Sequence, residues 1–350
     1  MDMHSNGRQL TIVGGGLAGL TLGIGLRQKS VPVTVWESGH YPRHRVCGEF
    51  ISGRGQETLR NLGLNSWVLN AGTISARTAM FVFRAAQTPV RPLPEPALSI
   101  SRYVLDALLA RVFQELGGEL LTDRRWPEED FGEGIVRATG RRVHQEAARW
   151  RWFGIKFHAR NVSLEADLEM HASREAYVGI SRLVGGEVNV CGLLRRAHGS
   201  QPPAGSWKDR LRGAAGTLLH ERLANADLVD GSFCSVAGLE LAPHEAAAHE
   251  ECCVGDALTM IPPVTGNGMS MALEAAELAI EPLAAYSHGD CSWLEARRRL
   301  AHDCDVAFKA RLAWSRWLQW MMFTPLLRTR FASIILGSER FWRLFFTRTR

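Results

Sequence analysis

Three glycines near the start of the chain constrain its fold more than any other feature of the sequence. Gly14, Gly16 and Gly19 follow the apolar, β-branched residues 10–13 and precede an apolar stretch that continues to Leu26. This order predicts a buried parallel strand, a tight turn and a helix. In such a turn the first glycine permits the bend, the second lets the backbone approach a pyrophosphate, and the third lets the helix pack on the strand. The spacing therefore predicts a dinucleotide-binding turn.

Glu37 supports the same prediction. It ends the next apolar run, residues 31–36, and lies 18 residues beyond Gly19, where a carboxylate can bind the ribose hydroxyls of an adenosine. The helix N-terminus adds unpaired N–H groups and the positive end of a dipole. A glycine-rich turn without a ligand would leave the position of Glu37 unexplained. These residues alone do not distinguish NAD from FAD.

A second glycine-rich segment follows about 240 residues later. A short apolar strand at residues 250–254 leads into it, and a helix at residues 271–283 follows it. An aspartate that ends a strand can accept hydrogen bonds from a sugar-like chain, and glycines let backbone N–H groups approach a planar ring or a phosphate. The residues that we expect to contact a cofactor here are Gly255, Asp256, Pro262, Gly266, Gly268 and Met269.

Together the two motifs resemble those of a known superfamily of FAD-dependent enzymes. It includes geranylgeranyl reductases, aromatic hydroxylases of the para-hydroxybenzoate hydroxylase type and flavin-dependent halogenases. The resemblance covers about residues 8–285 and implies FAD as the cofactor. By resemblance, Asp256 binds the ribityl chain of FAD, and the loop that contains Gly266 and Gly268 flanks the pyrophosphate and the isoalloxazine ring.

Three shorter segments extend the resemblance. Residues 42–49 resemble a segment of the geranylgeranyl reductase branch that lies against the flavin, and residues 99–102 resemble a helix start whose arginine contacts FAD. Residues 135–141 resemble a strand end that closes over the phosphates on the adenine side. The resemblance thus adds five residues to the expected FAD site: Arg45, Cys47, Gly48, Arg102 and Gly140.

Two departures from related sequences bear on the branch. Hydroxylases of this superfamily usually carry an aspartate-glycine pair where this chain has Thr139 and Gly140, and this difference favours the reductase branch. Residues 150–155 come close to the WxWxIP motif of halogenases, but the isoleucine is one place late and no proline follows. We interpret this match as a coincidence.

A further departure bears on the electron donor. Only about ten residues separate Asp123 from Ile135, where related enzymes usually have a small three-stranded meander. This shortening puts an ordinary docking surface for NAD(P)H in doubt.

The length and composition favour two interleaved domains. The chain has 350 residues, 46% hydrophobic and 22% charged, which is typical of a globular protein with more than one core. We predict an α/β fold in which a Rossmann-like FAD-binding domain is interleaved with an antiparallel β-sheet substrate domain, followed by C-terminal helices. The predicted segments are 1–75, 98–142 and 248–285 for FAD, 76–97 and 143–247 for the substrate sheet, and 286–350 for the helices.

The candidate catalytic residues are Cys47 and Tyr177. A flavin carries out the redox chemistry, so the protein must orient the substrate and supply a proton. Cys47 lies in the segment expected to face the flavin, where it either donates a proton or simply packs beside the ring. Tyr177 is a buried phenol that could bind a carbonyl oxygen, or it could be an ordinary core residue. His158 and His171 rank lower, because lone histidines in strands are more often structural.

Cysteine and histidine spacing indicates neither a metal site nor a disulfide framework. The seven cysteines form no CxxC pair, and their odd number in a long chain favours a reduced, cytoplasmic protein. His244 and His249 lie near Glu245 and Glu250, but alanines separate them, so we do not interpret them as metal ligands. No run of 18 apolar residues occurs, so the sequence predicts no membrane-spanning helix.

The C-terminal tail is strongly basic. Residues 309–350 contain nine basic residues and one acid, Glu339. Tryptophans in this tail recur every three or four residues, which is typical of one helical face. The tail is either a helical lid packed on the body or a peripheral contact with an acidic membrane surface. No recognised nucleic-acid-binding fold is present, so we expect no nucleic-acid partner. The tail residues that form the predicted face and its basic border include Trp314, Trp317, Trp320, Phe323, Leu327, Arg328 and Arg330.

Three hypotheses for the function follow. The first is an FAD-dependent reductase or dehydrogenase of the geranylgeranyl reductase type that acts on a hydrophobic polyprenyl, lipid or polyketide substrate. The second is an FAD-dependent monooxygenase that hydroxylates an aromatic or lipid-like phenol. The third is a non-catalytic FAD-binding protein. A shared scaffold does not by itself choose between them.

Overall fold

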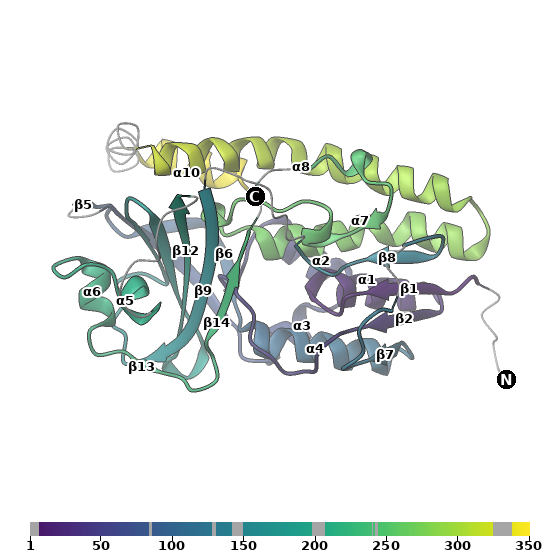
Figure 1. Cartoon of the computed structure of the whole chain (residues 1–350), viewed down its shortest axis with the longest axis horizontal. Coiled ribbons are helices and arrows are strands. Elements are labelled where there is room, and N and C mark those ends of the chain that lie inside the picture. The colour runs from purple at the N-terminus through teal and green to yellow at the C-terminus, as the bar shows by residue number, and fades with distance from the viewer. Residues whose placement is uncertain are drawn as a thin grey trace.

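The computed structural model describes residues 7–83, 86–127, 131–141, 150–197, 207–239, 241, 244–324 and 338–350. Two β-sheets lie toward opposite ends of an elongated molecule (Figure 1). Long helices run between them, and one of these extends along nearly the whole length. The site described below lies where the two sheets face each other.

The first sheet is parallel and begins with the strand that precedes the glycine turn. β1 (Leu10–Val13) pairs in parallel with β2 (Val33–Trp36) and β8 (Ile135–Arg137). β7 (Glu119–Leu121) extends the sheet beyond β2, and β15 (Cys252–Cys253) extends it beyond β8. The strand order β15-β8-β1-β2-β7 puts β1 in the centre. Buried β-branched residues dominate these strands, as a parallel sheet covered on both faces requires. The predicted Rossmann-like α/β fold is confirmed.

Helices cover this sheet. α1 packs against α4 and α7, and every residue from Leu17 to Leu26 is buried, which is typical of a helix enclosed on all sides. At Gly25 an added Cβ would lie 2.1 Å from Ile280 of α7, so a glycine is needed for this close approach. The helices of this part are α1 (Leu17–Gln28), α2 (Arg54–Asn61), α3 (Asn65–Asn70), α4 (Arg102–Glu115) and α7 (Gly268–His288).

The second sheet has ten strands and is mostly antiparallel. One pairing differs from the prediction, because β4 and β10 run parallel. These two strands come from separate passes of the chain, with α4 and part of the first sheet between them, so no hairpin forces them antiparallel. The strands are β3 (Phe50–Ile51), β4 (Ile74–Phe83), β5 (Ala86–Gln87), β6 (Arg91–Ser99), β9 (Trp150–Arg160), β10 (Leu168–Ala172), β11 (Ala176–Arg182), β12 (Val188–Ala197), β13 (Asp227–Leu228) and β14 (Cys234–Ala237).

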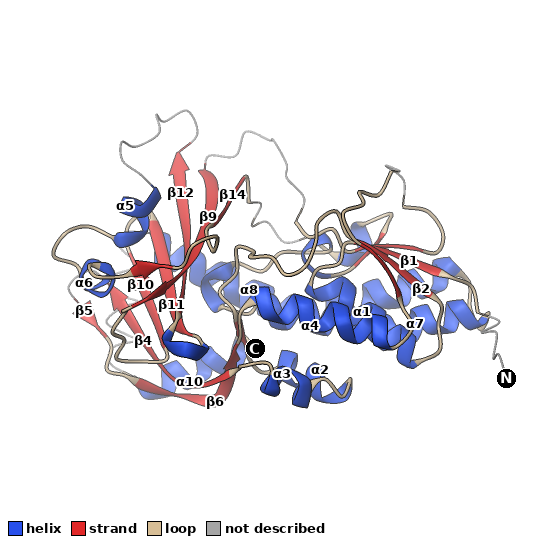
Figure 2. Cartoon of the chain, turned by 90° about the horizontal axis from the view of Figure 1, so that it is seen from below, coloured by secondary structure: helices blue, strands red, loops and turns tan. Residues whose placement is uncertain are grey.

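The chain enters and leaves the second sheet close to the expected positions. β4 begins and β6 ends within two residues of the predicted boundaries at 76 and 98. The first part of the strand predicted from residue 143 lies outside the described residues. Two short helices, α5 (Trp207–Arg212) and α6 (Leu218–Leu223), cover the outer face of this sheet (Figure 2). The division into domains itself stays a prediction.

The C-terminal part is helical, as predicted. α8 (Trp293–Phe323) runs from the first sheet's helix layer to the second sheet, and α10 (Glu339–Arg348) lies beside its far end (Figure 1). The predicted tryptophan face is divided in the structure, because Trp317 and Trp320 are 38% and 58% exposed whereas Phe323 is buried. The predicted positions Leu327, Arg328 and Arg330 lie outside the described residues. Within the described part, no helix is long and apolar enough to cross a membrane. The buried residues of α8 are Ala296, Leu300, Cys304, Phe308, Arg311, Leu312, Ser315, Leu318, Met321, Met322 and Phe323.

Candidate cofactor and substrate site

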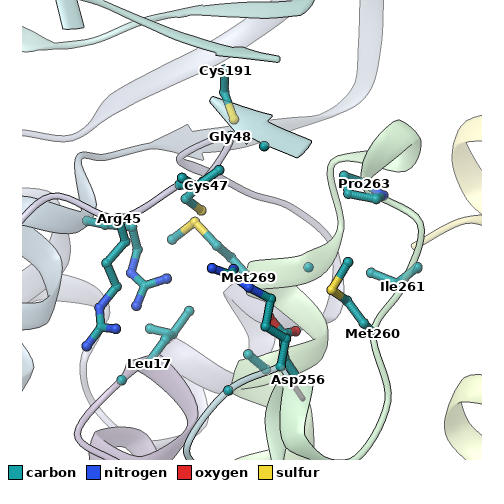
Figure 3. Close-up of a pocket in the computed structure, with 18 of the residues that line it drawn as sticks. Leu17, Arg45, Cys47, Gly48, Cys191, Asp256, Met260, Ile261, Pro263 and Met269 are labelled. Atoms are coloured by element: carbon teal, nitrogen blue, oxygen red, sulfur yellow. The ribbon is translucent and has the colours of Figure 1, made fainter. Parts of the chain in front are cut away.

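One large cavity lies between the two sheets. Its volume is about 1150 Å³, which is larger than the roughly 300–1,000 Å³ typical of a pocket for one small ligand. The glycine turn and the loop after β15 line one end of it, and strands of the second sheet line the other. In Figure 3, Cys47 and Gly48 lie between Cys191 of β12 and Asp256. The cavity therefore has room for a cofactor and a second molecule side by side.

The glycine turn has the geometry of a phosphate cradle. Gly14 has a φ of +114°, and a Cβ there would lie 2.2 Å from the carbonyl oxygen of Ala138. A Cβ at Gly19 would lie 2.0 Å from the carbonyl oxygen of Gly14. Gly16 differs, because it lines the cavity and an added Cβ would meet nothing within 4 Å. Gly16 also begins α1 without a side-chain cap, so the first N–H groups of α1 are open to a ligand.

Glu37 lies at the end of β2, as the sequence predicts, and is 3% exposed. Its carboxylate accepts hydrogen bonds from the backbone N–H groups of Gly15 at 3.1 Å and Gly39 at 2.9 Å. It also forms ion pairs with Arg43 at 2.5 Å and Arg45 at 3.1 Å. Burial raises the pKa of Glu37, but Arg45, Gly39 and Arg43 together outweigh this and lower it. The carboxylate is therefore ionised at the edge where a ribose would lie.

Asp256 lines the cavity at the carboxyl end of β15. Its side chain opens into the cavity (Figure 3). Desolvation raises the pKa of Asp256, although Arg141 and Arg102 act in the opposite direction. Gly266 follows in the left-handed conformation, with a φ of +65°. The carboxylate of Asp256 and the backbone at Gly266 thus line the same cavity from one loop.

Most of the residues predicted from the sequence line this one cavity. Those that do not are Gly19, Gly255 and Pro262. Gly255 has a φ of +64°, and a Cβ there would lie 2.7 Å from Ala18 on α1, so its role is packing. Pro262 is buried and precedes a short 3-10 turn. The predicted residues that do line the cavity are Gly14, Gly16, Glu37, Arg45, Cys47, Gly48, Arg102, Gly140, Tyr177, Asp256, Gly266, Gly268 and Met269.

The segment around Cys47 lies at the middle of the cavity. Burial raises the pKa of the Cys47 thiol, and the nearby Arg102 only partly offsets this. The thiol is therefore protonated near neutral pH. The guanidinium of Arg102 is committed to Asp106, with contacts of 2.6 and 2.7 Å, and the Asp106 side chain also binds Arg45 at 3.1 Å. This buried network fixes the two arginines that the resemblance assigns to FAD.

The other end of the cavity is an apolar chamber built around Tyr177. Tyr177 is 4% exposed, and its hydroxyl has no hydrogen-bond partner among the described residues. Burial raises the pKa of this phenol well above its ordinary value. A buried hydroxyl without a partner is costly, so it points to a ligand or a water. The chamber is lined by Phe81, Leu93, Leu168, Met170, Leu193, Leu239, Val264, Trp342, Phe345 and Phe346.

Sequence reasoning missed the part of the chamber that comes from α10. Trp342, Phe345 and Phe346 are spaced as one helical face. This spacing indicates a packed helix, but it does not show that the helix lines the cavity. The side chain of Arg350 holds this end of the chain in place. It donates to Ser52 Oγ at 2.8 Å and to the carbonyl oxygen of Thr265 at 3.1 Å. Burial lowers the pKa of Arg350 to about 9.

A cluster beside Cys47, of which His44 and Glu49 also line the cavity, resembles a metal site. Ligand atoms of His44, Glu49 and His158 lie within 4.8 Å of one another. However, Lys156 Nζ lies 3.0 Å from His44 Nδ1 and 3.1 Å from Glu49 Oε1. The ammonium group thus takes the place of a cation among these ligands. His171, the other histidine named above, pairs with Glu169 at 3.1 Å and does not line the cavity. The absence of a metal stays a prediction.

Comparisons with protein-family models and with curated proteins gave no match. Solved structures do match. The flavin-dependent brominase Bmp2 is 17% identical, covers 94% of both chains and has a TM-score of 0.69. PqsL from Pseudomonas aeruginosa, described as a probable FAD-dependent monooxygenase, is 15% identical, with a TM-score of 0.70, and covers 94% of this chain and 100% of its own. The chain has the fold of these flavoproteins.

The halogenase PltM agrees with this assignment of the fold. A variant of it in complex with FAD is 13% identical, with a TM-score of 0.71, and covers 87% of this chain and 75% of its own. The predicted fold of a flavin-dependent enzyme is therefore confirmed. The residues present also fit FAD, because a phosphate cradle, an ionised Glu37 and the carboxyl of Asp256 lie along one cavity.

Proposed function

We propose that this chain is an FAD-dependent oxidoreductase that acts on a neutral, hydrophobic small molecule. One observation carries the proposal: a single cavity joins the phosphate cradle at Gly16 to the apolar chamber at Tyr177. A bound FAD would span the cradle end and present its ring at Cys47 and Gly48. The fold shared with flavin-dependent enzymes supports this arrangement.

Monooxygenation is one candidate reaction. PqsL is described as a probable FAD-dependent monooxygenase and was solved with 2-aminobenzoylacetate, and Bmp2 is described as a flavin-dependent brominase. When bound, FAD would supply the redox chemistry, with oxygen as co-substrate. The chamber would exclude water, because its wall is almost wholly aromatic and aliphatic. Tyr177 would orient the substrate by hydrogen bonding to one polar group on it.

Reduction of the geranylgeranyl reductase type is the second candidate. The Cys47 thiol favours it, because this protonated group lines the cavity where a proton would be needed. In that reaction the thiol would hold the proton at Sγ and deliver it to the substrate. NAD(P)H or another reductant would supply electrons in either case.

The test is reduction of the FAD-loaded protein without oxygen, by NADPH, NADH or dithionite, followed by mixing with aerated buffer. A transient absorbance unlike that of oxidised or reduced flavin, with or without a hydrophobic ligand, supports the monooxygenase. Direct return to the oxidised spectrum under both conditions favours the reductase. Reduction by dithionite alone, without reduction by NADPH or NADH, favours a non-catalytic FAD carrier. If FAD does not bind, the proposal fails.

We also propose a peripheral contact with an anionic membrane surface. Trp317, Trp320 and Arg316 of α8 are exposed. Trp320 lies three residues from Trp317 and four from Arg316, so the three side chains lie on one side of the helix. Aromatic rings beside a cation suit the interface of an acidic bilayer. A hydrophobic substrate would be most abundant at such a surface.

A further inference from the structure

Glu49 has a backbone conformation that needs an explanation. Its φ is +55°, in the left-handed region that side chains other than glycine rarely adopt. The residue is also fully buried, at 0% exposed. It directly follows Cys47 and Gly48, and all three residues line the cavity. A buried acid in an unfavourable conformation persists only where its surroundings hold it.

Three donors hold the Glu49 carboxylate. His158 Nε2 lies 2.7 Å from Oε2, while Lys156 Nζ at 3.1 Å and the backbone N–H of Arg102 at 3.0 Å bind Oε1. Burial raises the pKa of Glu49, but His158, Lys156 and the Arg102 N–H outweigh it and lower it. Lys156 is itself 0% exposed. The carboxylate is therefore ionised and its oxygens are occupied, so it is poorly suited to move a proton.

The second sheet holds the residues before Glu49 in the same way. His158, Asn189 and Ser181 lie side by side on β9, β12 and β11, because Asn189 pairs with His158 on one side and with Ser181 on the other. Asn189 Nδ2 donates to the carbonyl oxygen of Cys47 at 3.0 Å. Ser181 Oγ donates to the carbonyl oxygen of Gly48 at 3.3 Å. One row of polar side chains thus binds three consecutive residues.

We propose that Glu49 is a positioning residue. Its carboxylate, held between Lys156 and His158, locks the segment 47–49 against the second sheet and so fixes Cys47 and Gly48 at the middle of the cavity. The part of this inference that concerns a bound flavin rests on the proposed function. The part that concerns Cys47 does not.

The first test is alkylation of Cys47 by iodoacetamide in the protein without FAD, measured against pH with site assignment by mass spectrometry. Removing a nearby carboxylate also changes the thiol's pKa, so the informative quantity is the limiting rate at high pH. For E49Q we expect this limiting rate to rise about tenfold. A shift of the midpoint alone, with an unchanged limiting rate, would show a purely electrostatic role and overturn the proposal.

Two further variants separate positioning from stability. The double variant E49Q/K156M removes both buried charges, so it should recover much of the thermal stability that E49Q loses, yet keep the raised limiting rate. A wild-type rate in the double variant would mean that charge balance alone matters. E169Q is the matched control: Glu169 is also 0% exposed and pairs with His171 and Arg222, so it should lose stability without changing Cys47.

The flavin gives an independent readout. In FAD-loaded E49Q/K156M we expect a shifted visible spectrum of the flavin, whereas E169Q should keep the wild-type spectrum. A wild-type spectrum in the double variant would contradict the flavin part of the inference. If no variant binds FAD, including the wild type, the proposed function fails while the alkylation result still decides the role of Glu49.

Discussion

The two ends of the cavity are built by different means. At the cradle end, two short motifs shape the site largely with their backbone, and the glycines of each motif lie close to one another in sequence. At the chamber end, side chains from β4, β6, β10, β11, β12 and α10 converge on one space. A backbone site is encoded by local spacing, whereas a side-chain site depends on which strands become neighbours. This difference decides which substitutions should be severe and what each should damage.

The largest expected effects come from two glycines in the cradle that do opposite things. In G19A the new Cβ would lie 2.0 Å from the Gly14 carbonyl oxygen, so we expect a loss of about 2–4 kcal/mol in the free energy of unfolding. In G16A the new Cβ would meet only open space, so stability should hold while FAD binding weakens by about 100-fold. Thermal unfolding and flavin titration measure the two quantities. Equal loss of stability in both variants would contradict the assignment of Gly16 to the ligand.

At the chamber end, a change of Tyr177 should affect binding of the substrate-like ligand and not stability. The Y177F variant removes a buried hydroxyl that has no partner among the described residues, so the unfolding free energy should stay constant or rise slightly. Binding of 1-naphthol should weaken by about tenfold, in line with the roughly 1.5 kcal/mol of one hydrogen bond. Binding of naphthalene, which has no hydroxyl, should not change. Fluorescence quenching measures both. Parallel losses for the two probes would show that Tyr177 only fills space.

The same contrast explains what could be predicted from the sequence. Gly14, Gly16 and Glu37 were found because their spacing carries the geometry. Trp342 and Phe346 were not placed, because no local pattern shows that α10 meets β6 and the second sheet. No separate role within residues 42–49 could be assigned to Glu49 from the sequence. Its left-handed backbone and its pairing with Lys156 of β9 become visible only in the folded chain. The parallel pairing of β4 with β10 was missed for the same reason: it joins segments that are far apart in the chain.

The segment that joins the two ends should respond to pH through His44. Burial, Lys156 and His158 lower the pKa of His44 to about 4, whereas an unfolded chain titrates near about 6.5. Between these values the unfolded state binds more protons, so stability is complete above about pH 6.5 and falls as the pH drops toward 4. The H44N variant should flatten this part of the stability curve in denaturant titrations at several pH values. The matched variant H40N changes an exposed histidine and should keep the wild-type slope.

The smallest expected effect lies outside both ends, on the exposed side of α8. If this helix contacts an acidic bilayer, R316Q should weaken binding to phosphatidylserine vesicles by about fivefold, equivalent to roughly 1 kcal/mol per basic residue near the surface. W320A should weaken it as well, because Trp320 is 58% exposed and can insert its ring at the interface. Neither change should alter stability or FAD binding, since neither side chain is buried. Vesicle sedimentation measures the effect, with phosphatidylcholine vesicles as the control. Equal binding of wild type and both variants to the two vesicle types would contradict the membrane contact. Trp317 and Trp320 would then be exposed residues of a helix that only packs on the body through its other face.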